Sequence, residues 1–210
     1  MRLLLGLATL CWAAPSFAQR DRVQLDVAVV TGSPSAEGAS VGTANLLEDA
    51  KTQELLRNGF PARIHYRLEL WRKAGWSNDR RGTSEWDVLV KYDPTTQLYD
   101  VVRRTADNRI HENFGGFPSL AAAETQIGRA FRVGLAPQRS GQYYYNLVID
   151  IETLTVSDLD ALEQWLRGPS APAHGNPLKA IRGGVGTLLS RLLGGDKRHY
   201  EQRSGVFTVP

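Results

Sequence analysis

The stretch "ARIHYRLELWR", residues 62–72, decides the fold. Along it, two series of side chains alternate strictly: Ile64, Tyr66, Leu68 and Leu70 are apolar, and Arg63, His65, Arg67 and Glu69 are polar or charged. Because successive side chains of a strand point to opposite faces, this pattern predicts a long strand with one face in a core. The other, charged face meets either solvent or a partner.

Four further segments have the period of a strand: 22–30, 84–92, 98–104 and 142–153. We expect 62–72, 84–92 and 98–104 to form an antiparallel meander, with a loop at 73–83 and a reverse turn at 93–97. "NRIHENF" adds a short edge strand at 108–114. In "QYYYNLVIDIET" the alternation places Tyr144, Asn146, Val148 and Asp150 on the face away from the core.

Helical periodicity appears in four places. The first helix runs from Leu46 to Leu56, with Asn45 as its N-cap and Asn58-Gly59 as its end, and the second covers 120–131 with Ser119 as its N-cap. A third follows Ser157, and a basic amphipathic helix is expected at 178–195. We therefore predict one α+β domain over 19–210, with a mainly antiparallel sheet or sandwich-like meander of about five to seven strands and three or four helices. Residues 31–43 and 168–177 are expected to be loops or linkers.

The amino-terminal segment indicates export. Arg2 provides a positive charge, 3–14 is an apolar run too short to span a bilayer, and Ser16-Phe17-Ala18 resembles a cleavage site. We expect residues 1–18 to be removed as a signal peptide, so that the mature chain begins at Gln19; an uncleaved anchor or a buried first helix is the alternative. Cleavage also removes Cys11, the only cysteine, which leaves no disulfide, thiolate metal site or cysteine nucleophile and suits a bacterial periplasm.

The sequence offers no strong chemical motif. The four histidines lack metal-ligand spacing, no nucleophile elbow is present, and "GGVGT" at 183–187 lacks the lysine of a phosphate-binding loop. The paired carboxylates Asp150 and Glu152 fit a solvated strand face better than a catalytic site. We expect no catalytic residues, no cofactor and no metal. The net charge of +3 is too small to drive nucleic-acid binding, and export makes nucleic acid an unsuitable partner.

Two surfaces remain as candidates for binding. On the charged face of the central strands, an aromatic side chain lies among cations, a composition that protein interfaces favour: Arg63, His65, Arg67, Trp71 and Lys91. The competing interpretation is that Arg63 and Arg67 simply pair with acids such as Asp87.

The second candidate surface is the basic helix at 178–195, with Lys179, Arg182, Leu188 and Arg191. It either lies on an anionic membrane surface or packs on its own sheet. We favour packing, because the chain must return so that "RSGVFTVP" at 203–210 can form an edge strand.

Four blocks of sequence carry a family resemblance: "LLRNGFPARIHYRLELWR" (55–72), "WDVLVKYDPTTQLYDVVR" (86–103), "FPSLAAAE" (117–124) and "YYYNLVIDIET" (143–153). Together they resemble successive parts of a bacterial exported family, the one labelled domain of unknown function 4390, over 45–153. The resemblance implies an envelope protein with no known catalytic residues and no known cofactor. It also suits an accessory role outside the cytoplasm.

These observations predict a non-catalytic exported protein of the periplasm or outer envelope, soluble after cleavage, which binds an envelope protein partner. An envelope hydrolase and a lipid-surface or membrane-surface binding protein with peripheral membrane contact are the alternatives. The sequence does not determine the oligomeric state.

Overall fold

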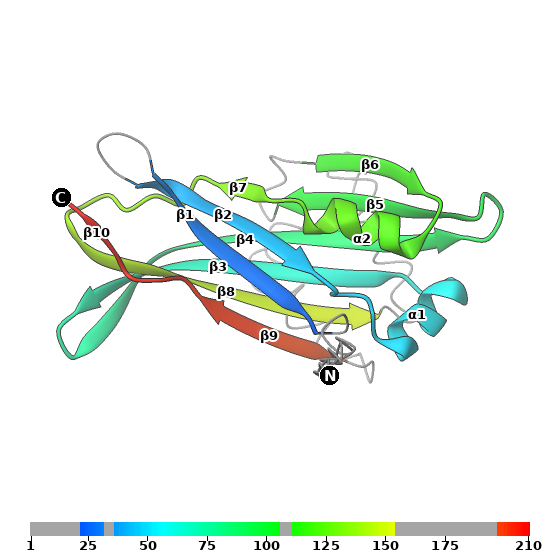
Figure 1. Cartoon of the computed structure of the whole chain (residues 1–210), viewed down its shortest axis with the longest axis horizontal. Coiled ribbons are helices and arrows are strands. Elements are labelled where there is room, and N and C mark those ends of the chain that lie inside the picture. Colours follow the sequence, from blue (N-terminus) through cyan, green and yellow to red (C-terminus); the bar gives the residue numbers. More distant parts are fainter. Residues whose placement is uncertain (1–21, 32–35, 106–110, 154–196) are drawn as a thin grey trace, which may run out of the picture.

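The computed structural model describes residues 22–31, 36–105, 111–153 and 197–210 and shows two antiparallel sheets with two helices (Figure 1). The strands are β1 (Gln24–Thr31), β2 (Ala36–Ala44), β3 (Ala62–Ala74), β4 (Ser77–Asp93), β5 (Leu98–Thr105), β6 (His111–Phe117), β7 (Phe131–Val133), β8 (Gly141–Thr153), β9 (Arg198–Arg203) and β10 (Phe207–Val209). The helices are α1 (Ala50–Arg57) and α2 (Leu120–Gly128). The prediction of an α+β fold dominated by antiparallel sheet is confirmed.

The larger sheet has seven strands in the order β10-β8-β3-β4-β5-β6, with β9 also paired to β8. The predicted meander is its centre: β3 pairs with β4, and β4 pairs with β5. The predicted edge strand is β6, and the predicted carboxyl-terminal edge strand is β10, although β9 was not predicted.

One face of the larger sheet packs against the smaller sheet, β1-β2-β7, and forms the core (Figure 1). The apolar series of β3 is almost completely buried, as its alternation predicts. Trp86 of β4 stacks on Tyr66 with ring centroids 5.0 Å apart, and it contacts Phe131 of β7 at 5.3 Å. The charged series of β3 therefore lies on the opposite face, which we call the outer face.

The prediction of a loop over 31–43 is wrong, because β2 occupies Ala36–Ala44 and pairs with β1 along its length. The sequence of β2 is rich in small residues, so it has no apolar periodicity. Strand β2 needs small side chains because it packs closely against β7: a Cβ on Gly38 would lie 2.1 Å from the carbonyl oxygen of Val133.

Helix α1 begins later than its apolar spacing suggests. Asp49 is the N-cap and accepts a hydrogen bond from the backbone N–H of Thr52 at 2.9 Å, whereas Asn45 lies before the helix with a φ of 62°. The predicted end at Asn58 is confirmed. Helix α2 has the predicted N-cap, Ser119, but ends at Gly128, because Phe131 belongs to β7.

The segment 73–83 is not a loop but the end of a long hairpin. Strands β3 and β4 continue to Ala74 and Ser77 and are joined by the two residues Gly75 and Trp76. Gly75 has a φ of 57°, the left-handed conformation that tight hairpin turns require and glycine adopts readily.

Several predictions fall on 154–196, outside the described residues. They are the helix after Ser157, the linker at 168–177 and the basic helix at 178–195. Two helices are present in the part of the chain that the structure describes, compared with the three or four predicted for the whole chain.

Candidate functional site

The outer face of the larger sheet holds two neighbouring clusters of polar side chains. They come from the centre of the sheet, where β3 is flanked by β4 on one side and by β8 and then β9 on the other. Although this face is opposite the core, several of its polar side chains are less than a tenth exposed: Glu69, Arg104, Asn146 and Glu152. Buried polar groups need partners, so the contacts among them decide what this face can bind.

The first cluster is a set of ion pairs around Asp87. Two of the three guanidinium nitrogens of Arg63 donate to Asp87: Nε lies 3.0 Å from Oδ1, and Nη2 lies 3.1 Å from Oδ2. Nη1 of Arg63 donates to Oε1 of Glu152 at 3.0 Å, and Nδ1 of His65 lies 2.9 Å from Oδ1 of Asp87. The side chain of Arg63 is only 15% exposed. Arg63 and His65 are therefore engaged inside the protein, and the expected pairing of Arg63 with Asp87 is confirmed.

The second cluster surrounds the carboxylate of Glu69. Nε1 of Trp71 donates to Oε2 at 2.9 Å, Nη1 of Arg80 donates to Oε1 at 3.3 Å, and Nδ2 of Asn146 donates to Oε2 at 3.4 Å. Arg67 completes the cluster, with its Nε 3.3 Å from Oε1. Arg67 thus pairs with an acid on its own strand rather than across the sheet.

These contacts keep Glu69 ionised. Burial alone would raise the pKa of its carboxyl group, but hydrogen bonds from Trp71 and Asn146 and the charge of Arg67 outweigh burial and hold the pKa below its ordinary value. Glu69 consequently acts as a fixed acceptor that orients its neighbours.

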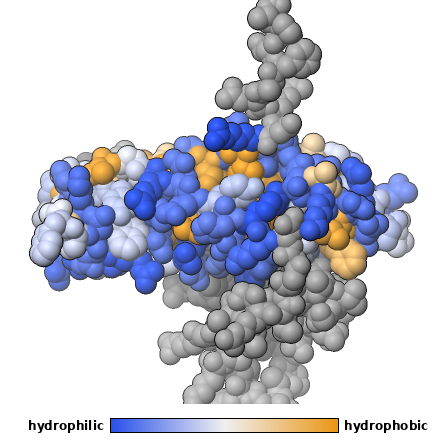
Figure 2. Space-filling model, turned by 90° about the horizontal axis from the view of Figure 1, so that it is seen from below, coloured by the Kyte–Doolittle hydropathy of each residue, from blue (hydrophilic) through white to orange (hydrophobic). Residues whose placement is uncertain are grey.

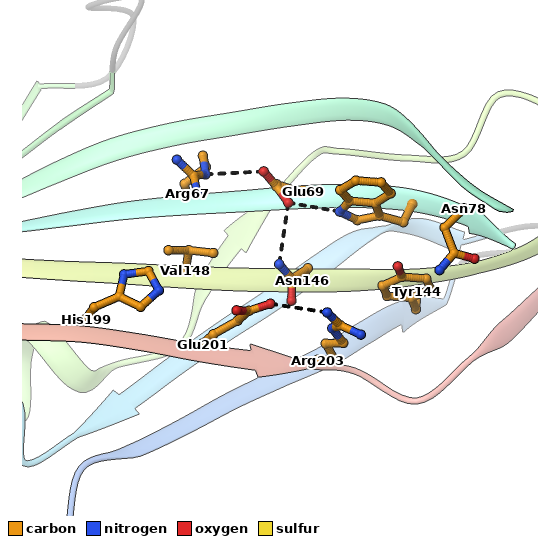
Figure 3. Close-up of a pocket in the computed structure, with 10 residues that line it drawn as sticks. Arg67, Glu69, Asn78, Tyr144, Asn146, Val148, His199, Glu201 and Arg203 are labelled. Atoms are coloured by element: carbon orange, nitrogen blue, oxygen red, sulfur yellow. Dashed lines mark hydrogen bonds and ion pairs between the residues drawn. The ribbon is translucent and has the colours of Figure 1, made fainter. Parts of the chain in front are cut away.

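Beside Glu69, the outer face contains a hollow of about 390 Å³ between β3, β8 and β9 (Figure 3). The side chains that line it include Arg67, Trp71, Tyr144, Asn146, Val148, His199, Glu201 and Arg203. Asn146 is central to it. Its nitrogen faces Glu69, and Figure 3 shows its oxygen directed toward Glu201 and Arg203. This oxygen is buried and has no hydrogen-bond partner.

Aromatic side chains form one side of the hollow. Trp71 and Tyr144 are register partners on β3 and β8, with centroids 6.4 Å apart and ring planes within 6° of parallel. The guanidinium of Arg203 lies 5.9 Å from the centroid of the Tyr144 ring. A cation and two aromatic rings thus stand in a row across β3, β8 and β9.

The structure brings together only part of the predicted docking surface. Arg67 and Trp71 line the hollow, whereas Arg63 and His65 belong to the Asp87 cluster. Lys91 lies on the outer face farther along β4, where its register partner is Asp100, and it does not line the hollow. The predicted membrane-surface residues lie outside the described residues: Lys179, Arg182, Leu188 and Arg191.

Sequence reasoning missed the residues that β9 contributes and the role of Arg80. The alternation of 142–153 had already placed Tyr144, Asn146 and Val148 on the outer face, but nothing local showed that β9 would lie beside them. Arg80 reaches Glu69 because a β-bulge between Leu70 and Trp71 shifts the register, so that Arg80 faces Trp71.

Glu124 is a second carboxyl group with an altered environment. It lies on α2, and its Oε1 accepts a hydrogen bond from the backbone N–H of Leu47 at 3.0 Å. Burial raises its pKa. Because Ala123 and Ile127 of the same helix are part of the core, Glu124 lies on the core side of the sheet, and it does not form a pair with Glu69 on the outer face.

Within the described ranges, no group of three or more His, Cys, Asp or Glu side chains is placed to hold a metal ion. Neither of the two described helices has the length and apolar character needed to cross a bilayer. Comparison of the chain with protein-family models, with curated proteins and with solved structures finds no match. The resemblance to the exported family therefore stays a prediction.

Proposed function

We propose that this protein is a non-catalytic exported module of the bacterial envelope and that the hollow beside Glu69 binds a protein partner. The observation that carries the proposal is the Asn146 carbonyl oxygen, which is buried and has no hydrogen-bond partner. A buried acceptor without a donor costs about 1–3 kcal/mol. Because the oxygen is itself buried, a partner's N–H or O–H group reaches it only when the exposed side chains of Glu201 and Arg203 move aside, and that contact removes the cost.

The contact with Glu69 determines the orientation of the Asn146 side-chain amide. An ionised carboxylate can only accept hydrogen bonds, so Glu69 requires the amide nitrogen of Asn146 on its side. The oxygen must then point the opposite way, toward Glu201 and Arg203. Glu69 in this way prepares an acceptor for a donor that comes from outside the chain.

The other side chains around the hollow suit a protein partner. Tryptophan, tyrosine and arginine are enriched in the energetic centres of interfaces, and here Trp71, Tyr144 and Arg203 lie in one row. The side chains of Arg67 and Arg203 are 37% and 66% exposed, so both can reach an acidic group on the partner. A segment with backbone N–H groups and a nearby carboxylate would meet both the acceptor and the cations.

Export follows from the amino-terminal pattern of Arg2, the apolar run and Ser16-Phe17-Ala18. A binding role is also consistent with the state of Glu69, because four neighbouring groups stabilise its charged form rather than prepare it for proton transfer.

Site-specific photocrosslinking in living cells tests the proposal. A photoreactive residue at Glu201, which lines the hollow and is exposed, should crosslink to a discrete envelope protein. The matched control carries the same residue at Ala121, an exposed position on α2. A crosslink at Glu201 that disappears with Trp71→Ala supports the proposal, whereas equal crosslinking at both positions or none at either contradicts it.

A further inference from the structure

The β3–β4 hairpin projects from one end of the molecule, at the left of Figure 1. All nine residues from Lys73 to Arg81 are exposed. Along 77–85, β4 pairs with β3 and with no other described strand, because the β4–β5 register begins only at Trp86, whereas β3 is paired with β8 as far as Lys73. The hairpin end, which we call the arm, therefore has no described neighbour along its β4 edge or at its tip.

Trp76 stands at the tip of this arm and is fully exposed. It makes no contribution to the core, so folding gives no reason for the largest apolar side chain at this position. The other large hydrophobic residue that is exposed in the described part of the chain is Val206, and it lies near the hairpin. Val206 lines a second hollow, of about 190 Å³, together with Lys73 and Asn78 of the hairpin.

The surface around the tip carries several cations. Lys73 has no ion pair among the described residues, and the side chains of Arg80 and Arg203 are 56% and 66% exposed. Arg81 pairs with Asp79, which is the one acid within the exposed arm. From below, the visible surface of the described residues is largely hydrophilic, with small hydrophobic patches (Figure 2).

We propose that the hairpin tip is a membrane-contact site that inserts Trp76 into the headgroup region of an anionic lipid surface. Tryptophan favours this region because its ring is apolar and its N–H is polar. Lys73 and the neighbouring arginines then lie within reach of lipid phosphates, where each cation strengthens binding.

A protruding tip fits a lipid surface better than a protein. A stable protein interface buries about 800 Å² on each partner and needs a matching surface, whereas this tip offers two loop residues and the ends of two strands. A bilayer accepts such a tip without a preformed pocket.

Vesicle co-sedimentation tests the site, with phosphatidylglycerol vesicles compared with phosphatidylcholine vesicles at low and high salt. We expect the protein to bind the anionic vesicles, with binding weakened by salt. Trp76→Ala should lower the bound fraction several-fold, Trp76→Tyr should retain most of it, and Lys73→Ala should lower affinity about fivefold. Every variant is used as the mature chain that begins at Gln19, so that the apolar run at 3–14 does not contribute to vesicle binding.

Leu188→Asp separates this site from the basic segment at 178–195. If the hairpin is the contact site, this variant binds anionic vesicles as the unchanged protein does. Wild-type protein that does not bind, Trp76→Ala protein that binds as well as wild type, or binding that only Leu188→Asp abolishes would overturn the inference. The two proposals share the cation Arg203, but the Trp76 and Lys73 variants test only the membrane contact, since neither residue lines the hollow.

Discussion

The amide nitrogen of Asn146 lies 3.4 Å from Oε2 of Glu69, and this contact turns the Asn146 carbonyl oxygen away from Glu69, toward Glu201 and Arg203 (Figure 3). The two residues come from β3 and β8 and are direct register partners. This cross-strand pair of polar residues thus leaves one buried acceptor, the carbonyl oxygen of Asn146, without a hydrogen-bond partner. The predictions below test this arrangement and the fold that supports it.

The charge of Glu69 should be visible in the pH dependence of stability. Its pKa in the folded protein lies below the ordinary value of 4.5, so its ionised form stabilises the fold above that pH, and the contribution is lost as the pH falls through the folded pKa. We expect Glu69→Gln to cost about 1–3 kcal/mol at neutral pH. Urea unfolding should also show a weaker loss of stability below about pH 4.5 for this variant than for wild type.

Asp49, whose pKa is lowered chiefly by the backbone N–H of Thr52, should leave some acid dependence in the Glu69→Gln variant. Glu201→Gln is the matched control, because the Glu201 side chain is 44% exposed and its pairing with Arg203 is at the surface. Identical pH profiles of stability for wild type and Glu69→Gln would contradict a lowered pKa for Glu69 in the folded protein.

Arg63 should matter for stability and not for binding. Removing it leaves Asp87 and Glu152, whose side chains are 15% and 9% exposed, without their shared cation. We expect Arg63→Ala to lower the free energy of unfolding by about 2–4 kcal/mol, measured by urea denaturation. Arg81→Ala breaks an exposed ion pair and should cost less than about 1 kcal/mol. Similar costs for the two variants would contradict the distinction.

Two tryptophans should behave in opposite ways. Trp86 is 2% exposed and stacks on Tyr66 in the core, so Trp86→Ala should cost about 3–5 kcal/mol. Trp76→Ala should change stability by less than about 0.5 kcal/mol, because Trp76 is fully exposed. Thermal unfolding followed by circular dichroism measures both, and a large loss in Trp76→Ala would place that side chain in a packed environment.

The central strands could be predicted because side-chain alternation is a local property. Ile64, Tyr66 and Leu68 report one buried face of β3 without reference to any other segment. The strand β2 could not be predicted in this way, since close contact with β7 leaves room only for small side chains such as Gly38, and small side chains carry little periodic signal.

The candidate site was less predictable than the sheet. Alternation placed Arg67, Trp71 and Asn146 on one face, but their contacts depend on long-range register. Asn146 faces Arg203 only because β9, which follows β8 by more than forty residues, returns to its edge. The bulge that brings Arg80 to Glu69 is likewise a property of two strands together.

Export can be measured directly. The amino-terminal pattern predicts cleavage after Ala18, so intact-mass analysis of protein recovered from the periplasm should give a chain that begins at Gln19. A recovered chain that still carries Met1 would contradict cleavage.

The binding role of the hollow is tested most directly by the dissociation constant of the crosslinked partner. Asn146→Leu keeps a side chain of similar size but removes both the acceptor and the N–H donor to Glu69, and titration calorimetry should show affinity at least about tenfold weaker than for wild type. Lys91→Ala, on the same face but outside the hollow, should bind as wild type does. Equal affinities for Asn146→Leu and wild type, with both proteins folded, would contradict the account.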